Sequence, residues 1–145
     1  MSTITKYSAP SRKKPSSVMK FLSSKGLLVG EMLDFGCGRG FDAEYYGMDK
    51  YDPNWGFASL PEKKYDTITC NWVLNLVEPA EQEMIIQQIK SLLKPTGIAY
   101  ITVLRGFKEN YNCYITRGYM QRMIYLDLES LKKASRYQTY VLKIS

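Results

Sequence analysis

The apolar and polar positions along the chain predict several short strands. They are expected over residues 32–35, 65–72, 98–104 and 137–144, with a weaker one over residues 48–51. The run over residues 65–72 alternates most clearly, with Ile68, Cys70 and Trp72 on one face and Thr67 and Thr69 on the other. These short runs are typical of strands buried in a sheet.

Apolar residues recur at helical spacing in other stretches. Helices are expected over residues 17–26, 41–46, 79–93 and 128–134. The third has the strongest signals, because Pro79 stands at its start and Lys90 near its end, with Pro95 and Gly97 as stop signals.

The remaining segments lack a periodic pattern. Residues 57–64 and 105–118 are expected to be loops, and residues 1–17, rich in Ser, Lys and Pro, a mobile basic arm. The order of elements predicts one α/β domain over residues 18–145, with a mostly parallel central sheet, flanking helices and a reduced size. Its ligands are expected at the carboxyl ends of the strands.

Composition narrows the possible chemistry. A chain of 145 residues, 45% hydrophobic and 23% charged, is typical of one globular domain. No apolar run is long enough for a membrane helix or a signal core, so no membrane is expected. The odd number of cysteines, Cys37, Cys70 and Cys113, predicts reduced thiols and a cytoplasmic protein. The chain has no His, which excludes a His-based triad and a His-rich metal site, and no metal is expected.

The net charge of +6 is unevenly distributed. Residues 1–29 hold six basic residues and no acidic one, residues 30–104 hold 11 acidic and six basic, and residues 105–145 hold eight basic and three acidic. Two interpretations stay open: the basic ends bind a polyanion such as nucleic acid, with Arg105, Arg117 and Arg122 forming a rim near the ligand, or they are solvated surface.

The most informative stretch is Asp34–Gly40, which begins in the first strand and continues directly beyond it. Gly36, Gly38 and Gly40 occupy alternate positions, a spacing that allows positive φ and lets the backbone approach a ligand closely, because a Cβ would forbid the one or obstruct the other. The dinucleotide fingerprint requires a glycine at the sixth position, where Phe41 stands, which argues against a nucleotide-dependent oxidoreductase. An ordinary glycine-rich turn remains the alternative.

The acidic-x-Gly-x-Gly-x-Gly spacing resembles the first motif of class I S-adenosylmethionine-dependent methyltransferases. A narrower resemblance, to small bacterial and phage methyltransferase-like proteins, is carried by Gly40-Phe41-Asp42, Asp52-Pro53-Asn54-Trp55, Asn71-Trp72-Val73-Leu74-Asn75 and Thr116-Arg117-Gly118. Residues 65–71 and the Leu92–Gly97 turn resemble later motifs of that family, in the same order. The resemblance covers residues 27–104 and implies a Rossmann-like fold, the cofactor S-adenosylmethionine and methyl transfer. The third strand of that family, and the acid that would bind the adenine amino group, are not evident in this sequence.

The resemblance also implies a cofactor site. Its members are Asp34, Gly36, Cys37, Gly38, Gly40, Asp52 and Asn71. Asp52 would accept hydrogen bonds from both ribose hydroxyls, since a carboxylate offers two acceptor oxygens. Asp49 is the second choice for that role, and a plain Asp-Pro turn is the structural alternative for Asp52.

The substrate residues implied are Trp72, Asn75, Arg105 and Arg117, and Trp72 is equally compatible with plain core. Asn71 lacks the two prolines that follow it in amino-methylating DNA enzymes. No general base is assigned, because the sulfonium is already a good leaving group. The methyl acceptor and the oligomeric state stay undetermined, and the alternative function is a catalytically silent binding or regulatory module.

Overall fold

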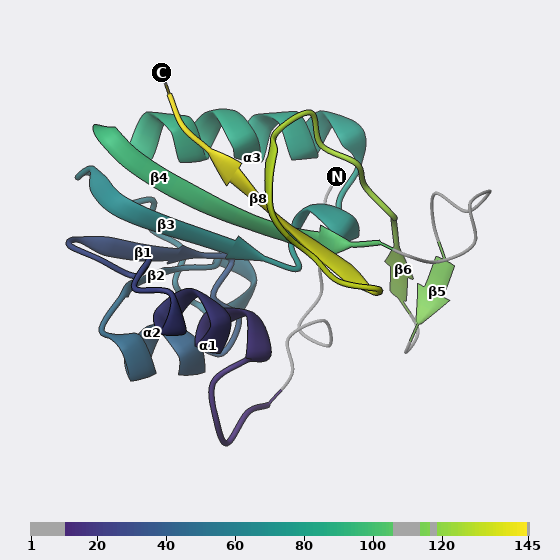
Figure 1. Cartoon of the computed structure of the whole chain (residues 1–145), viewed down its shortest axis with the longest axis horizontal. Helices are drawn as coiled ribbons and strands as arrows, with labels where there is room; N and C mark the ends of the chain where they lie inside the picture. Colours follow the sequence, from purple (N-terminus) through teal and green to yellow (C-terminus); the bar gives the residue numbers. More distant parts are fainter. Residues whose placement is uncertain (1–10, 106–113, 117–118, 145) are drawn as a thin grey trace.

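The protein is described from a computed structural model, which covers residues 11–105, 114–116 and 119–144. Six strands form one sheet in the order β2-β1-β3-β4-β8-β7 (Figure 1). They are β1 (Met32–Phe35), β2 (Asp49–Tyr51), β3 (Tyr65–Asn71), β4 (Leu93–Leu104), β7 (Glu129–Lys133) and β8 (Tyr137–Leu142). Strands β1 to β4 run parallel to one another, β8 pairs antiparallel with β4, and β7 pairs antiparallel with β8. This arrangement confirms the expected α/β class with a mostly parallel sheet.

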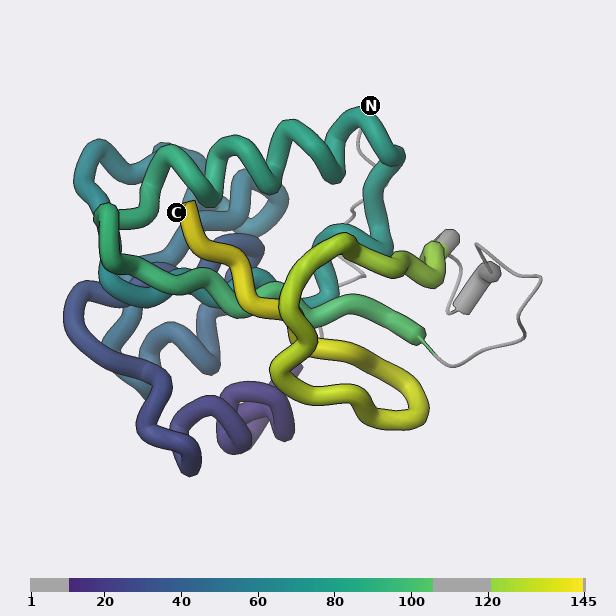
Figure 2. Tube along the Cα trace, turned by 45° about the horizontal axis from the view of Figure 1, so that its top comes forward, coloured from purple at the N-terminus to yellow at the C-terminus, as the bar shows by residue number. Residues whose placement is uncertain are grey.

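Helices cover both faces of this sheet (Figure 1). Helices α1 (Ser17–Ser24) and α2 (Phe41–Tyr46) lie on one face and α3 (Pro79–Leu92) on the other, and Figure 2 shows the same layers from a second angle. Each face has its own core. Ile85 and Ile89 of α3 join the larger core, while Met19 and Leu22 of α1 join the smaller one.

Local signals explain where the helices begin. The Ser16 hydroxyl caps α1 by accepting a hydrogen bond from the Met19 amide. Pro79 occupies the first turn of α3, where its missing N–H costs nothing. Both helices were expected from the sequence. Their apolar stripes are buried as the spacing predicts, except for Met84 of α3, which is 51% exposed.

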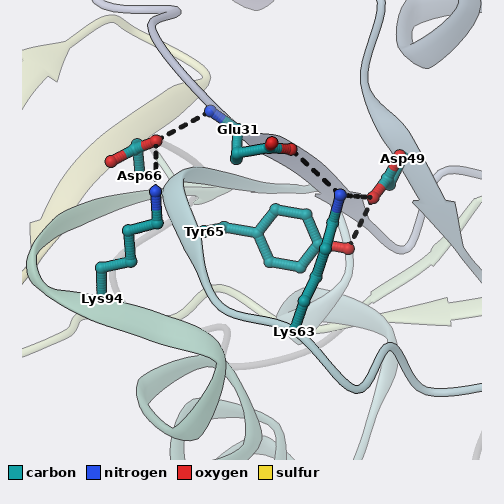
Figure 3. A network of polar contacts seen from close by, with 6 residues as sticks. All are labelled: Glu31, Asp49, Lys63, Tyr65, Asp66 and Lys94. Carbon is teal, nitrogen blue, oxygen red and sulfur yellow. Dashed lines mark hydrogen bonds and ion pairs between the residues drawn. The ribbon is translucent and has the colours of Figure 1, made fainter.

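The segment between β2 and β3 contains a short 3₁₀ helix, η2 (Pro53–Trp55), followed by the expected loop over residues 57–64. No strand continues the sheet beyond β2 in the described residues. The end of this loop is held at the amino ends of the strands, where Lys63 Nζ lies 3.0 Å from Glu31 and 3.1 Å from Asp49 (Figure 3). The Tyr65 hydroxyl donates to the same Asp49 carboxylate at 2.7 Å.

Three sequence predictions about elements were wrong. The helix expected over residues 128–134 is strand β7, because pairing with β8 overrides local helix preference. Strand β4 begins at Leu93 rather than at residue 98. It passes through Gly97, which lies so close to β3 that a Cβ there would be only 2.7 Å from the Tyr65 carbonyl oxygen. Within the expected loop 105–118, β5 (Tyr114–Thr116) pairs with β6 (Tyr119–Gln121).

Trp72 also departs from its predicted face. Strand β3 ends at Asn71, and Trp72 has a φ of 64°, the only non-glycine residue among those described with positive φ. This turn moves the indole from the face of Ile68 and Cys70 to the smaller core on the α1 face. Alternation therefore fails where the strand stops.

The described part of the predicted arm is in contact with the domain. Pro15 and Ser16 are buried, and Ser16 donates hydrogen bonds from its amide and its hydroxyl to the two carboxylate oxygens of Asp42, at 2.9 and 2.8 Å. Residues 1–10 lie outside the described residues. Within the ranges that are described, no helix is both long and apolar enough to cross a membrane.

Candidate cofactor and substrate site

A cavity of about 270 Å³ lies at the carboxyl ends of β1, β2 and β3. Its walls come from the glycine loop, η2, the turn after β3, one face of α3 and the residues just before α1. Ligands of open α/β sheets bind at such a position, because the connections diverge to both faces there. The structure thus brings together segments as far apart in the sequence as Arg12 and Gln88.

The glycine loop has the backbone that its spacing predicted. Gly36, Gly38 and Gly40 all have positive φ, at 83°, 58° and 87°. At Gly36 a side chain would collide with Val73, so this glycine is required by packing within the protein. Gly38 and Gly40 line the cavity, and a Cβ at Gly40 would meet only the flexible Lys50 side chain, at 3.2 Å.

Asp52 connects this loop to the end of β2. One of its oxygens accepts a hydrogen bond from the Gly38 amide at 2.8 Å, and the other accepts from the Asn54 amide at 3.0 Å. Burial raises the pKa of the Asp52 carboxyl, while these two bonds lower it. The carboxylate is therefore fixed in orientation at the cavity wall, and each oxygen keeps a further lone pair.

Asp49 lies elsewhere. It begins β2 and contacts Lys63 and Tyr65 (Figure 3). It is not part of the cavity wall. The Tyr65 hydroxyl and then Lys63 hold its pKa below the ordinary value. The position of Asp49 at the amino end of the strand separates it from the glycine loop.

Asp34 lies at the floor of the cavity and is 5% exposed. Burial raises the pKa of its carboxyl from 3.8 to about 7, although the Thr69 hydroxyl donates to it at 2.8 Å and lowers the pKa. Asp42 and Asp52 add to the rise, and Arg12 opposes it. Asp34 is consequently the ionisable group of the cavity that titrates near neutral pH.

The cysteine of the loop is not a nucleophile at neutral pH. Cys37 is half-buried, and burial with the nearby carboxylates raises the pKa of its thiol to about 12. Its backbone contributes instead, since the Cys37 amide donates to the Tyr51 carbonyl at 3.2 Å. Cys37 thus lines the cavity as a neutral side chain.

Asn71 and Trp72 reach the cavity from the end of β3. The Asn71 Nδ2 donates to the Met19 sulfur at 3.3 Å, while its Oδ1 is buried without a hydrogen-bond partner in the described residues. The Trp72 ring packs edge-on against Tyr137, with centroids 5.5 Å apart. The strained φ of Trp72 holds this bulky side chain at the cavity rim.

Two other predicted substrate residues, Asn75 and Arg105, are not at the cavity. Asn75 is buried and donates to Gln121 at 2.8 Å. Arg105 donates to the Ala134 carbonyl at 2.6 Å, and Arg122 pairs with Glu78 at 2.8 Å. Arg117 lies outside the described residues. Arg105 and Arg122 are thus engaged within the protein, although position and charge favoured a rim role.

Sequence reasoning missed several wall residues. Glu81, Met84, Ile85 and Gln88 line the cavity from one face of α3, and their i, i+3, i+4, i+7 spacing was available as a signal. Trp55 lines it from η2, with the Arg39 guanidinium 4.4 Å from the ring centroid. Arg12 and Ser16 reach it from the segment assigned to the arm, for which the sequence offered no signal.

The described residues contain no group of three His, Cys, Asp or Glu side chains placed to hold a metal ion. The residues of the cavity do fit a ligand that carries an ammonium group, a ribose and no phosphate. The buried Asn71 Oδ1 lacks a donor, the Asp52 oxygens have free lone pairs, and the wall contains acidic groups at Asp34 and Asp42. Unpartnered buried acceptors of this kind are costly unless a ligand completes them.

The sheet order, the glycine loop after β1 and the acid after β2 define a class I S-adenosylmethionine-dependent methyltransferase fold. A family model described as a methyltransferase domain matches residues 7–134, so the chain belongs to the methyltransferase domain family. The recognised family, the methyltransferase class and S-adenosylmethionine as the cofactor of that class are confirmed. No curated protein sequence matches the chain.

Solved structures agree on the fold. A 1,6-didemethyltoxoflavin N1-methyltransferase from Burkholderia thailandensis, with bound 1,6-didemethyltoxoflavin and S-adenosylhomocysteine, has a TM-score of 0.62 and 17% identity over 85% of this chain and 74% of its own. The CcbJ methyltransferase from Streptomyces caelestis has a TM-score of 0.64 and 15% identity, over 92% of this chain and 100% of its own. Magnesium protoporphyrin IX methyltransferase from Synechocystis PCC 6803, with bound S-adenosylmethionine, has a TM-score of 0.52 and 18% identity, over 86% of this chain and 76% of its own.

Proposed function

We propose that this protein binds S-adenosylmethionine in the cavity and transfers its methyl group to an acceptor bound beside Trp72. The observation that carries the proposal is the fixed Asp52 carboxylate, hydrogen-bonded to the Gly38 amide of a glycine loop with positive φ. This arrangement couples the acceptor for a ribose to the backbone that approaches the amino-acid part of the ligand. Asp52 is therefore preferred to Asp49 as the ribose ligand.

Different residues of the cavity are suited to different parts of the ligand. Gly38 and Gly40 leave room along the backbone, and Asp34, the deepest acid, offers negative charge to an ammonium group. The Asn71 Oδ1 offers an unused acceptor at the end of β3. When bound, S-adenosylmethionine supplies a methyl group on a sulfonium, which is already activated for direct displacement.

Catalysis by this chain then consists mainly of positioning. Trp72 and Asn71 lie where β3 ends, and the packing of Trp72 against Tyr137 limits the movement of its ring. A rigid wall at this point orients an acceptor atom toward the methyl group, and orientation alone lowers the barrier substantially. No general base is assigned, since the mechanism requires none for an acceptor that has no proton to lose.

For the acceptor, a small molecule is the first candidate. Two of the similar structures are named for methyltransferases of 1,6-didemethyltoxoflavin and of magnesium protoporphyrin IX, which are not macromolecules, and the cavity wall offers the aromatic side chains Phe41, Trp55 and Trp72. Nucleic acid is the second candidate, favoured by the basic segments at residues 1–29 and 105–145. Because Arg105 and Arg122 bond within the protein, binding of nucleic acid would depend on the other basic residues of these segments.

Calorimetric titration of the purified protein tests the binding step. S-adenosylmethionine and S-adenosylhomocysteine are expected to bind with one site per chain, and a nicotinamide dinucleotide is expected not to bind. Absence of binding by both sulfur ligands would contradict the proposal. Radiolabelled methyl transfer to a small-molecule extract, to DNA and to RNA, each at two salt concentrations, then separates the two acceptor classes. Binding without transfer to any of them would favour the silent binding module.

A further inference from the structure

Aromatic side chains continue from the cavity rim onto the surface outside it. Trp72 belongs to the cavity wall, and its ring packs edge-on against Tyr137, with centroids 5.5 Å apart. The Lys132 Nζ lies 5.6 Å from the Tyr137 centroid and 4.3 Å from that of Phe21. These four side chains, which we call the aromatic row, come from the end of β3, from β8, from β7 and from α1. The row therefore runs outward from the cavity on the α1 face of the sheet.

The rings of the aromatic row are only partly covered. Phe21, Trp72 and Tyr137 are each half-buried, and all three pack against the smaller core. Partly exposed rings offer a surface against which a flat group can pack. Because the proposed cofactor occupies the cavity, an acceptor bound beside Trp72 has to lie along this outer surface.

A β-bulge brings Lys132 to the aromatic row. The pairing of β7 with β8 shifts between Ser130 and Lys132. Successive residues of a regular strand point to opposite faces, yet Leu131 packs against the smaller core and Lys132 lies over the Phe21 ring of the same core. Bulges redirect side chains in this way and are frequent next to functional sites. The bulge thus places a cation on a face that already holds the residue before it.

The ammonium group of Lys132 has no anionic partner in the described residues. The same is true of Lys25, whose Nζ lies 5.9 Å from the Phe21 centroid, since neither lysine takes part in an ion pair there. The face of an aromatic ring attracts a cation but leaves its charge in place. Two ammonium groups beside one ring produce a positive potential, which attracts an anionic group.

We propose that the methyl acceptor is a small planar molecule with an anionic group such as a carboxylate, which Lys132 binds while the planar part packs against Tyr137 and Trp72. Two ring spacings, of 5.5 and 5.6 Å, separate Trp72 from the ammonium group. The anionic group and the methylated atom are therefore at opposite ends of the acceptor. The proposal rests on the proposed function and names the substrate class of the same site.

The anionic group does not take part in the transfer itself. A lone pair of the acceptor atom forms the bond to the methyl carbon, the carbon–sulfur bond breaks, and its electron pair stays on the sulfur of S-adenosylhomocysteine. A proton carried by the acceptor atom is released to water. Because the anionic group is not the site of methylation, the product keeps its negative charge.

Equilibrium dialysis of the protein saturated with S-adenosylhomocysteine tests the anion site with two probes of similar shape, 2-naphthoate and the neutral 2-naphthamide. The ligand fills the cavity, which leaves the aromatic row as the expected site. The unsubstituted protein is expected to prefer 2-naphthoate by about fivefold, and Lys132→Met to lose that preference, because Met keeps an apolar chain over Phe21 without the charge. Equal binding of the two probes by the unsubstituted protein would overturn the proposal.

Lys133→Met is the matched control. Lys133 is the next residue along β7 and is exposed, and its replacement changes the net charge by the same amount. This variant is expected to keep the preference for 2-naphthoate. A preference lost equally in both variants would show that net charge alone attracts the probe, and would overturn the role of Lys132.

Transfer from radiolabelled S-adenosylmethionine to a small-molecule extract tests the class of acceptor. The labelled product is expected to be retained on an anion exchanger at neutral pH. With the fraction that contains the acceptor, Lys132→Met is expected to raise KM by about fivefold and to change kcat by less than about twofold, because the anion site binds rather than reacts. Lys133→Met should leave both constants, and both variants the affinity for S-adenosylhomocysteine, unchanged.

The outcomes are distinguishable. A labelled product that passes through the exchanger, or label found only in DNA or RNA, would overturn the proposal while leaving methyl transfer intact. Failure of the unsubstituted protein to bind S-adenosylhomocysteine, or binding without transfer to any acceptor, would instead overturn the proposed function, and this proposal with it.

Discussion

At the scale of single residues, Asp34 contributes to the pH dependence of the free energy of unfolding. Its carboxyl has a pKa of about 7 in the folded protein, against 3.8 for an ordinary Asp, because it is buried. Between these values the folded state binds a proton that the unfolded state does not. The contribution of Asp34 to the free energy of unfolding therefore falls as pH rises from about 4 to about 7, and stays constant above that range.

We expect Asp34→Asn to remove this part of the pH dependence, because the amide is uncharged and still accepts from Thr69. Unfolding by denaturant at several pH values between 4 and 8 measures the difference. The free energy of unfolding of the unsubstituted protein should fall relative to that of Asp34→Asn over this range. A constant difference across the range would show that Asp34 is ionised throughout.

Asp52 and Asp49 offer a second test at this scale. Asp52→Ala is expected to weaken S-adenosylhomocysteine binding by about tenfold or more, since it removes a charged acceptor and frees the Gly38 amide. Asp49→Ala is expected to leave the affinity unchanged, because Asp49 contacts Lys63 and Tyr65 outside the cavity. Calorimetry gives both affinities. A larger loss in Asp49→Ala would reverse the assignment of the ribose ligand.

At the scale of elements, contacts at the amino ends of the strands hold the end of the 57–64 loop, where no further strand continues the described sheet beyond β2. Lys63 joins Glu31 and Asp49, the buried ring of Tyr65 carries its hydroxyl to Asp49, and Lys94 pairs with Asp66 at 3.0 Å (Figure 3). The ion pairs are largely exposed, and exposed pairs contribute little to stability. The Tyr65 hydroxyl is the stronger contact, because it belongs to a buried side chain.

Tyr65→Phe is expected to lower the free energy of unfolding by about 1 kcal/mol, the usual contribution of such a hydrogen bond. Cofactor affinity should not change, because the cavity lies at the opposite ends of the strands. Denaturant unfolding and calorimetry measure the two effects, with Lys63→Met as a comparison that is expected to cost less. A loss of cofactor affinity in Tyr65→Phe would mean that the two edges of the sheet are coupled.

At the scale of the whole molecule, the cavity is closed by segments from both faces of the sheet. Ser16 before α1 is tied to Asp42 of α2, and α3 closes the other side. A ligand in this position contacts several elements at once and binds the folded state alone. It therefore stabilises the whole domain by mass action.

S-adenosylhomocysteine at about 100 times its dissociation constant is accordingly expected to stabilise the domain by about 2.7 kcal/mol. Thermal unfolding at increasing ligand concentration should show one transition that moves steadily upward. Ser16→Ala is a useful comparison, because it removes the hydroxyl bond to Asp42 and the cap of α1. A transition temperature independent of ligand concentration would contradict binding to the folded domain.

The elements that the sequence predicted well are those whose signals are local. The glycine spacing after Phe35 predicted positive φ, the stripe of Ile85 and Ile89 predicted α3, and Pro79 marked its start. Asp52 could be preferred to Asp49 because it stands where β2 ends. In each case the physical cause, a required backbone angle or a periodic burial, acts within a few residues.

What only the tertiary structure decided depends on contacts between distant segments. Residues 129–133 form a strand because β8 supplies their hydrogen-bond partners, and Trp72 changes face because β3 ends one residue earlier. Arg105 is engaged by the carbonyl of Ala134, across 29 residues of sequence, so its charge alone was a misleading guide. The sequence by itself determined the family and the loop that receives the ligand, because local backbone geometry specifies both. The complete wall of the cavity required the fold, because it joins side chains from η2, α3 and the residues before α1 that no local pattern relates.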